Sequence, residues 1–215
     1  MSNTLEQQKK KLIEKLIFQD IIKTDKVKKA MLQTPRELFI SENQKNQAYL
    51  DTPLQIENNQ TISAPHMVAI MAEALDLKPS QKVLEVGAGS GYHAAVTSKI
   101  IGEKGVVYSI ERHKELAERA IKNIKNADIK NIKIIIGDGS EGLAKYAPYN
   151  RIYVTCASPE IPKPLIKQLK DPGKILIPVG YTYCDLILFE KKQGKVIEKN
   201  LGACAFVPLI GKYGH

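Results

Sequence analysis

An apolar strand that runs directly into three closely spaced glycines constrains this chain more than any other feature. The segment is Val83-Leu-Glu-Val-Gly-Ala-Gly-Ser-Gly-Tyr92, with Gly87, Gly89 and Gly91 after the strand and Glu85 two residues before the first glycine. Glycine has no Cβ, so such a turn lets a nucleotide-like ligand approach the backbone closely. A dinucleotide fingerprint needs Gly-x-Gly-x-x-Gly, and here the third glycine comes one residue early. An ordinary tight strand–helix turn is the alternative explanation.

Apolar segments alternate with amphipathic ones after residue 82. We predict strands over residues 83–86, 105–110, 132–136, 152–155, 175–179 and 186–190, and helices over 92–101, 113–126 and 162–169. This rhythm predicts an α/β fold of the Rossmann-like, doubly wound type, whose mostly parallel sheet is covered by helices on both faces. Ligands bind such sheets beyond the carboxyl ends of the strands. That rule places on one rim the glycine turn, Glu111, Asp138-Gly139 and Ala157-Ser158.

The first third of the chain predicts an N-terminal helical addition. Apolar spacing indicates two helices within residues 5–33, with Asp25 as the N-cap of the second and Pro35 closing it. Residues 40–62 are expected to form a loop, and Ser63-Ala-Pro65 to cap and open a helix that runs to about Leu75. One domain over residues 1–215 is the simplest partition: N-terminal helices and loop over 1–78, and a ligand-binding core with C-terminal strands over 79–215.

Composition excludes several classes of protein. The 215 residues are 43% hydrophobic and 26% charged, which is typical of a soluble globular chain, and no apolar run is long enough to cross a bilayer. Residues 1–11 lack the apolar core of a secretory signal, and residues 9–17 indicate an amphipathic surface helix rather than a membrane-bound one. The net charge of +9 would suit nucleic acid, but the lysines are scattered and mixed with acids, which favours a solvated surface.

Cysteine and histidine usage points to a reducing compartment without a metal. The three cysteines show no paired spacing, and an odd, sparse set without a signal peptide is typical of the cytoplasm; they are Cys156, Cys184 and Cys204. The four histidines show no metal-ligand spacing with one another or with cysteine; they are His66, His93, His113 and His215. We therefore expect no structural or catalytic metal.

Three parts of the chain are candidates for contact with a ligand. Glu111 ends the second core strand, where a carboxylate can accept hydrogen bonds from both hydroxyls of a ribose. The alternative interpretation is that Glu111 is simply an exposed acid in the first turn of a helix. Asp138 lies between two glycines, where it can accept an adenine amino group or form a simple turn. The segment Ser63-Ala-Pro-His66 would offer an anion the free N–H groups of a helix N-terminus and the hydroxyl of Ser63, or would only cap the helix.

Together these segments resemble the protein-L-isoaspartate O-methyltransferases, which belong to the S-adenosylmethionine-dependent methyltransferases. The resemblance spans nearly the whole chain in order, and its Ser-Ala-Pro-His-Met and Pro-Glu-Ile-Pro segments are specific to this family. The matching segments are Ala30-Met31, Pro35-Arg-Glu-Leu-Phe39, Thr61-Ile-Ser-Ala-Pro-His-Met-Val68, residues 83–95, Tyr108-Ser-Ile-Glu-Arg112, Gly137-Asp-Gly139, residues 147–155, Pro159-Glu-Ile-Pro162, Ile177-Pro-Val-Gly180 and Phe206-Val-Pro-Leu-Ile-Gly211.

The resemblance implies transfer of a methyl group from S-adenosylmethionine to the α-carboxylate of L-isoaspartyl residues in damaged proteins, with S-adenosylhomocysteine as the product. It assigns Ser63 to catalysis. Cofactor binding would fall to Ile62, Ser63, His66, Glu85, Gly87, Gly89, Gly91, Glu111, Arg112, Asp138 and Gly139. Substrate binding would fall to Ser63, Ala64, Pro65, His66, Val207 and Pro208. The expected protein is a cytoplasmic monomer that acts on isoaspartyl proteins, without nucleic acid, membrane or metal.

The chain departs from the family pattern in two respects, and its sequence leaves two competing functions open. The family usually has a glycine where this chain has Glu57 and often a small residue at Asn59, which concerns peptide preference; Cys156, more often alanine, is interpreted as a small buried residue. An RNA methyltransferase would need a base pocket where the chain has Thr155-Cys-Ala-Ser-Pro159. A nucleotide-binding module without activity, such as a NAD-sensing domain, is disfavoured by the early third glycine.

Overall fold

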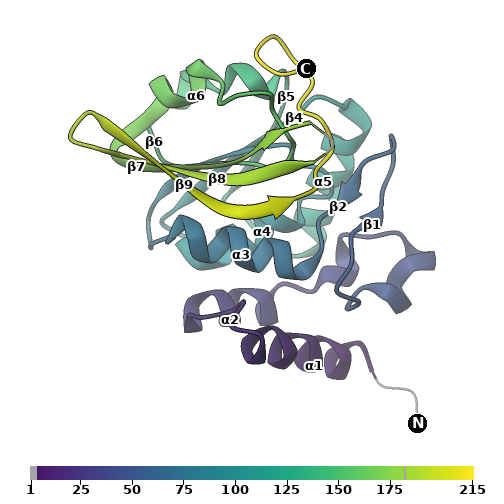
Figure 1. The fold of residues 1–215 in the computed structure, drawn as a ribbon. Helices are drawn as coiled ribbons and strands as arrows, with labels where there is room; N and C mark the ends of the chain where they lie inside the picture. Colours follow the sequence, from purple (N-terminus) through teal and green to yellow (C-terminus); the bar gives the residue numbers. More distant parts are fainter. Residues whose placement is uncertain (1–3, 182) are drawn as a thin grey trace.

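Seven strands form one mixed sheet in the order β5-β4-β3-β6-β7-β8-β9 (Figure 1). The computed structural model describes residues 4–181 and 183–215; residues 1–3, part of the segment expected to lack a secretory signal, and residue 182 lie outside it. The strands are β3 (Lys82–Val86), β4 (Val106–Glu111), β5 (Ile132–Ile136), β6 (Tyr149–Val154), β7 (Leu169–Gly180), β8 (Cys184–Lys192) and β9 (Lys195–Cys204).

The sheet is doubly wound about β3, as the sequence predicted. Strand β3 pairs in parallel with β4 on one side and with β6 on the other. The chain moves outward from β3 through β4 to β5 and then crosses back to β6 and β7. The strand order therefore reverses between β3 and β6, and in open α/β sheets the ligand-binding crevice lies at such a point.

Strands β8 and β9 extend the sheet as an antiparallel meander beyond β7. The sequence predicted a strand within β8 but not β9. Strand β9 lies at the edge of the sheet and is exposed along most of its length, so it lacks the apolar signal by which buried strands are found. Its lysines, among them Lys195 and Lys199, suit an edge that has no further strand to pair with.

Alternate residues of the core strands enter two hydrophobic clusters, one on each face of the sheet. Val83 belongs to the larger cluster with α3 (Pro65–Leu75) and α4 (Tyr92–Ile101), whereas Leu84 belongs to the smaller cluster with α6 (Lys163–Gln168). Helix α5 (Lys114–Asn126) adds Ile124 to the larger cluster, and short 3₁₀ turns η3 (Gly139–Glu141) and η4 (Ala144–Tyr146) follow β5. The predicted covering of both faces is confirmed.

The N-terminal helices α1 (Leu5–Phe18) and α2 (Asp25–Gln33) form a further layer outside α3 and α4 (Figure 1). The prediction that Asp25 caps α2 was wrong, because Thr24 is the N-cap. The carboxylate of Glu73 on α3 accepts hydrogen bonds from the backbone N–H and the hydroxyl of Thr24, at 2.8 and 3.0 Å. The contact between Thr24 and Glu73 thus sets where α2 begins, and it joins the outer layer of helices to α3.

The segment Pro35-Arg-Glu-Leu-Phe39 joins this outer layer to the helix that follows the glycine turn. Within it, η1 (Arg36–Leu38) buries the guanidinium of Arg36, which lies 5.0 Å from the ring centroid of Tyr92. Phe39 meets the same ring edge-on at 5.6 Å. Tyr92 is the first residue of α4, so its contacts with Arg36 and Phe39 hold the start of α4 against the N-terminal segment.

Residues 40–62, expected to be a loop, contain η2 (Glu42–Gln47) and the two-residue strands β1 (Leu54–Gln55) and β2 (Thr61–Ile62), which pair antiparallel. The large hydrophobic cluster joins residues from both predicted parts of the chain, 1–78 and 79–215. The single-domain partition stays a prediction that this packing supports. In the described ranges, no helix combines the length and apolar character needed to cross a membrane.

Candidate active site

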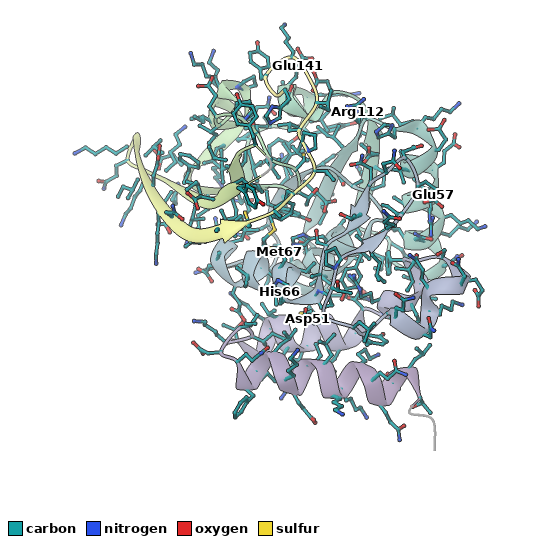
Figure 2. All side chains as sticks on the ribbon, turned by 45° about the vertical axis from the view of Figure 1, so that its right-hand side comes forward. Asp51, Glu57, His66, Met67, Arg112 and Glu141 are labelled. Carbon is teal, nitrogen blue, oxygen red and sulfur yellow. The ribbon has the colours of Figure 1, made fainter. Side chains whose placement is uncertain are left out.

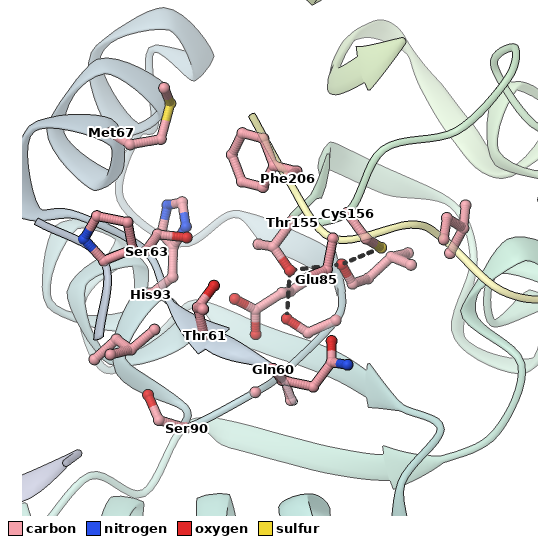
Figure 3. Close-up of a pocket in the computed structure, with 18 of the residues that line it drawn as sticks. Gln60, Thr61, Ser63, Met67, Glu85, Ser90, His93, Thr155, Cys156 and Phe206 are labelled. Carbon is pink, nitrogen blue, oxygen red and sulfur yellow. Dashed lines mark hydrogen bonds between the residues drawn. The ribbon is translucent and has the colours of Figure 1, made fainter. Parts of the chain in front are cut away.

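A cavity of about 610 Å³ opens at the carboxyl ends of β3, β4 and β6, at the point where the strand order reverses. Three other parts of the chain complete its wall. They are the segment around β2 and the start of α3, Gly139 after β5, and residues 203–210 at and beyond the end of β9. Figure 3 shows side chains from β2, α3, β3 and the end of β6, together with Phe206, around one space. The cavity therefore joins the glycine turn to both regions that the family resemblance assigned to substrate.

The glycine turn requires glycine for two physical reasons. Gly87 and Gly89 have φ angles of +95° and +51°, a region that residues with a Cβ rarely adopt. A Cβ on Gly87 would also lie only 2.4 Å from the Oγ1 atom of Thr155. The Thr155 hydroxyl lies 2.7 Å from the carbonyl oxygen of Gly87 and can donate a hydrogen bond to it. The backbone of β3 and the end of β6 are thus held in direct contact at the cavity.

Glu111 links the second strand to this turn. Its Oε2 atom accepts a hydrogen bond from the Gly89 N–H at 3.0 Å, and its Oε1 atom accepts one from the His113 N–H at 3.0 Å. The side chain is only 6% exposed and lines the cavity. Carboxylates retain further lone pairs after two such bonds, so Glu111 can still accept from a ribose hydroxyl.

The start of α3 differs from the prediction that Ser63 caps it. Ala64 is the N-cap, and it makes no side-chain hydrogen bond. Instead, the carboxylate of Asp51 accepts hydrogen bonds from the backbone N–H and the Nδ1–H of His66, both at 2.9 Å (Figure 2). Asp51 comes from the preceding loop, fifteen residues earlier, and it replaces a local cap.

The first turn of α3 consequently has no N–H group free for an anion. Pro65 has no N–H, His66 donates to Asp51, and the amides of Met67 and Val68 both donate to the carbonyl of Ala64. The expectation that this helix start offers unpaired N–H groups was therefore wrong. Ser63 lines the cavity, and in the described part of the chain its hydroxyl has no hydrogen-bond partner.

Asp138 lies away from the cavity wall. Its Oδ1 atom accepts hydrogen bonds from the N–H and hydroxyl of Ser140, and its Oδ2 atom accepts one from the Lys212 N–H at 2.8 Å. Burial opposes ionisation of Asp138, but the Lys212 N–H, both groups of Ser140 and the charge of Arg112 together lower its pKa. Gly211 packs so closely that a Cβ there would lie 2.0 Å from Oδ1. The charged carboxylate thus holds the C-terminal segment beside Gly139.

Most of the residues predicted for the site lie together. Those that line the cavity are Ile62, Ser63, Ala64, His66, Glu85, Gly87, Gly89, Glu111, Arg112, Gly139, Val207 and Pro208. Three others do not line it, namely Pro65, Gly91 and Asp138. Gly91 is the N-cap of α4, and a Cβ there would lie 3.3 Å from Ile124, so it serves helix packing. Ala157 and Ser158, also expected on the rim, are fully buried.

Several other residues that line the cavity were not predicted from the sequence, among them Tyr92, His93, Thr155 and Phe206. Thr155 had a usable signal, because it directly follows the β6 strand on the ligand-binding edge. His93 had none, because it lies within α4 and its 6% exposure arises from tertiary packing. Burial lowers the pKa of His93 to about 3, so its imidazole is neutral at pH 7.

Glu85 borders the cavity from beneath and has no solvent exposure. The hydroxyl groups of Ser109 and Tyr153 hydrogen-bond its carboxyl oxygens, the latter at 3.0 Å. Burial raises the pKa of Glu85 to about 8, and the two hydrogen bonds only partly oppose it. Glu85 is therefore mostly protonated at neutral pH, and it links β3 to β4 and β6 rather than presenting a charge to a ligand.

The two departures from the family pattern have structural counterparts. The carboxylate of Glu57 forms an ion pair with Arg119 on α5, which ties the loop before β2 to the core. Asn59 has a φ of +56°, a conformation that asparagine tolerates better than most residues. Cys156 is buried, in agreement with its interpretation as a small core residue. Among the described residues, no group of three or more His, Cys, Asp or Glu is placed to hold a metal ion.

Comparison with known proteins matches the architecture to one family. The family model for protein-L-isoaspartate(D-aspartate) O-methyltransferase matches residues 7–214. The chain belongs to this family. A protein-L-isoaspartate O-methyltransferase of Methanococcus aeolicus is 53% identical over 94% of this chain and 94% of its own length. Protein-L-isoaspartate O-methyltransferase 2 of Archaeoglobus fulgidus is 53% identical over 97% of this chain and 95% of its own.

Solved structures agree with this assignment. One described as a protein-L-isoaspartate O-methyltransferase has a TM-score of 0.88 at 31% identity and covers 96% of this chain, with 67% of its own chain aligned. A Plasmodium falciparum protein of the same description, in complex with S-adenosyl-L-homocysteine, has a TM-score of 0.85 at 31% identity, covering 97% of this chain and 99% of its own. The fold and the methyltransferase class predicted from the sequence are confirmed.

Replacing Glu85 with Gln should change how stability depends on pH. The folded pKa of about 8 lies above the ordinary value of 4.5, so between these values the folded chain binds more protons than the unfolded chain. The stabilisation of the folded state that results from this difference is complete below pH 4.5 and is lost as pH rises through about 8. The free energy of unfolding of the wild type should fall between pH 5 and pH 9. In Glu85→Gln, whose side chain stays neutral, this fall should be smaller by roughly 1–4 kcal/mol. Urea unfolding at both pH values measures this; parallel pH profiles for the variant, the wild type and an exposed control, Glu14→Gln, would contradict it.

Replacing Glu111 with Ala should weaken binding of S-adenosylhomocysteine by roughly 1.5–3 kcal/mol, the range for hydrogen bonds to a charged group. The variant loses the bond to the Gly89 N–H as well as any acceptor for a ribose hydroxyl. Isothermal titration calorimetry measures the affinity. Glu115→Ala, an exposed acid on α5, is the matched control and should bind as the wild type does. Equal affinities for the two variants would show that the adenosine pocket lies elsewhere.

Proposed function

We propose that this protein repairs damaged proteins by transferring the methyl group of S-adenosylmethionine to the α-carboxylate of L-isoaspartyl residues. The observation that carries the proposal is the continuity of the cavity. One space of about 610 Å³ is bounded by the glycine turn and Glu111 on one side and by Ser63 and residues 203–210 on the other. A methyl donor and a peptide carboxylate can therefore meet in it.

The cofactor would lie along the carboxyl ends of β3 and β4. Gly87 and Gly89 leave backbone uncovered for its methionine end, and Glu111 would accept from the ribose hydroxyls. Adenine would lie near Gly139 and Arg112, both of which line the cavity. Asp138 would act at this end chiefly through the C-terminal segment that it holds, because it does not line the cavity and its carboxylate already accepts hydrogen bonds from Ser140 and Lys212.

The isoaspartyl carboxylate would be oriented by the Ser63 hydroxyl. Ser63 lies one residue before the N-cap of α3, and Asp51 fixes that helix start through His66. Since the amides of His66, Met67 and Val68 are already bonded, the hydroxyl of Ser63 is the side-chain donor that this segment offers to an anion. Ala64 and His66 would line the same subsite, and Val207 and Pro208 would bound it from the opposite wall.

The chemistry requires orientation more than acid–base catalysis. The acceptor is a carboxylate with an ordinary pKa of about 4, so it is ionised at neutral pH without a general base. The donor is a sulfonium, which is already activated. Alignment of oxygen, methyl carbon and sulfur can supply roughly 7–11 kcal/mol of barrier reduction, and exclusion of water strengthens the remaining electrostatics. The methyl ester would then close to a succinimide, which reopens partly to normal aspartate.

We also propose that the protein is a cytoplasmic monomer that acts on proteins and peptides rather than on nucleic acid or a membrane. The odd, sparse set of three cysteines in the sequence supports a reducing compartment. The net charge of +9 would assist the approach of an anionic substrate.

The purified protein should methylate an L-isoaspartyl peptide and largely ignore the same peptide with normal aspartate. The extra backbone methylene moves the carboxylate, and a site that acts by orientation is sensitive to that shift. Incorporation of labelled methyl groups into the two peptides and into RNA measures the choice. Equal labelling of both peptides would reject the proposed substrate, and labelling of RNA alone would favour an RNA methyltransferase.

Ser63→Ala should keep S-adenosylhomocysteine affinity near that of the wild type but lower kcat/KM for the isoaspartyl peptide by about 10- to 100-fold, since each decade corresponds to roughly 1.4 kcal/mol. The structure gives Ser63 no capping role, so its thermal stability should change little. Steady-state kinetics beside a thermal melt tests both statements, with Ser80→Ala at an exposed turn as the control. A folded variant with full activity would exclude the orienting role, whereas complete loss of turnover would indicate a more direct chemical role.

A further inference from the structure

Two cysteines that are twenty residues apart in the sequence face each other beside the cavity. Cys184 begins β8 and Cys204 ends β9, and the two are directly opposed in the antiparallel pair. Their Sγ atoms lie 3.5 Å apart, and the Cys184 thiol lies 3.2 Å from the Cys204 carbonyl oxygen, to which it can donate. Their spacing in the sequence gave no sign of this pairing.

The geometry points to a reversible disulfide couple between Cys184 and Cys204 in the wall of the cavity. Directly opposed residues of antiparallel strands have Cα atoms about 4.5 or 5.5 Å apart, and both values lie within the range of about 4.4–6.8 Å found for disulfides. The sulfur atoms must approach from 3.5 Å to a bond length of about 2.0 Å, which side-chain rotation can supply without moving either strand.

Access to this pair runs through the cavity. Cys204 is partly exposed and lines the cavity, whereas Cys184 is 5% exposed. A small-molecule disulfide would therefore react first with Cys204. The Cys204 thiolate attacks one sulfur of the oxidant, forming a mixed disulfide and releasing one thiolate. The Cys184 thiolate then attacks Cys204 Sγ, forming the protein disulfide and releasing the second thiolate. The two protein thiol protons pass to the two released thiolates.

The couple should respond slowly at neutral pH. Burial, together with the hydrogen bond to Cys184, raises the pKa of Cys204 to about 12. Only a thiolate attacks a disulfide, so the first step accelerates as pH rises towards that value. This behaviour suits a modification that accumulates under sustained oxidation and is reversed by a dithiol reductant, rather than a catalytic thiol.

Formation of the Cys184–Cys204 disulfide would restrain the wall of the cavity. Cys204 directly precedes residues 205–210, all of which line the cavity, including Val207 and Pro208 of the proposed peptide subsite. The bond would anchor the start of this segment to β8, which is itself paired along its length with β7. Peptide binding should therefore change more than cofactor binding, because Glu111 and the glycine turn lie on other strands.

The decisive experiment is oxidation of the folded protein with glutathione disulfide at pH 8.5, followed by alkylation, unfolding, digestion without reductant and mass spectrometry. We expect a linked peptide pair containing Cys184 and Cys204, and Cys156 recovered as a free thiol. Cys156 is the internal control, because it is also buried and has no cysteine partner in the described chain. Recovery of all three thiols, or of a stable glutathione adduct on Cys204 alone, would overturn the proposal.

Two further readouts separate a specific couple from chance oxidation. The oxidised wild type should melt several degrees higher than the reduced form and return on reduction, whereas Cys204→Ser and Cys184→Ala, two substitutions that keep the residues small, should show no shift. Cys156→Ser should behave as the wild type. A shift that persists in either single variant would overturn the proposal.

The effect on catalysis rests on the proposed function. Oxidised wild type should show a KM for the isoaspartyl peptide raised at least threefold, with S-adenosylhomocysteine affinity within twofold of the reduced protein. Cys204→Ser should show neither change after oxidation. An unchanged KM in a protein shown to carry the disulfide would refute the restraint of the wall, whereas an inactive reduced protein would refute the methyltransferase proposal and leave the disulfide result standing.

Discussion

The double hydrogen bond that Glu111 accepts is the constraint on which the cofactor side of the cavity depends. One carboxylate joins the end of β4, the middle of the glycine turn and the first residues before α5, through the N–H groups of Gly89 and His113. Gly87 can then pack against Thr155 in a conformation open only to glycine. Because the two loops that follow β3 and β4 share this acid, its geometry decides whether the backbone stays uncovered for a ligand.

The acceptor side depends on a different carboxylate. Asp51 satisfies both the backbone and the ring of His66, so the start of α3 is rigid but no longer attractive to an anion through free N–H groups. In the proposed function this segment contributes the hydroxyl of Ser63 in place of a general anion site. A donor held at one position of the backbone responds to where a carboxylate lies, which suits an enzyme that must separate isoaspartate from aspartate.

Local patterns predicted the strands β3 to β8 and most of the residues around the cavity, because apolar runs and glycine spacing are set by the chain itself. Most of the errors about individual residues concern partners from other segments of the chain. Glu73 sets the start of α2, Asp51 replaces Ser63 as the cap of α3, and Lys212 engages Asp138 from 74 residues away. Strand β9 is exposed at an edge, so it carries no burial signal. The facing of Cys184 and Cys204 likewise arises from strand register, which spacing alone does not specify.

Burial also controls the charge beneath the reacting groups. It raises the pKa of Glu85 to about 8 and lowers that of His93 to about 3, so both border the cavity in neutral form at pH 7. In the proposed reaction a sulfonium and a carboxylate neutralise each other, so the transition state carries less separated charge than the reactants. A fixed anion under the glycine turn would stabilise the sulfonium before transfer more than during it, and would slow the reaction. A protonated Glu85, held by Ser109 and Tyr153, joins β3 to the neighbouring strands β4 and β6 without that penalty.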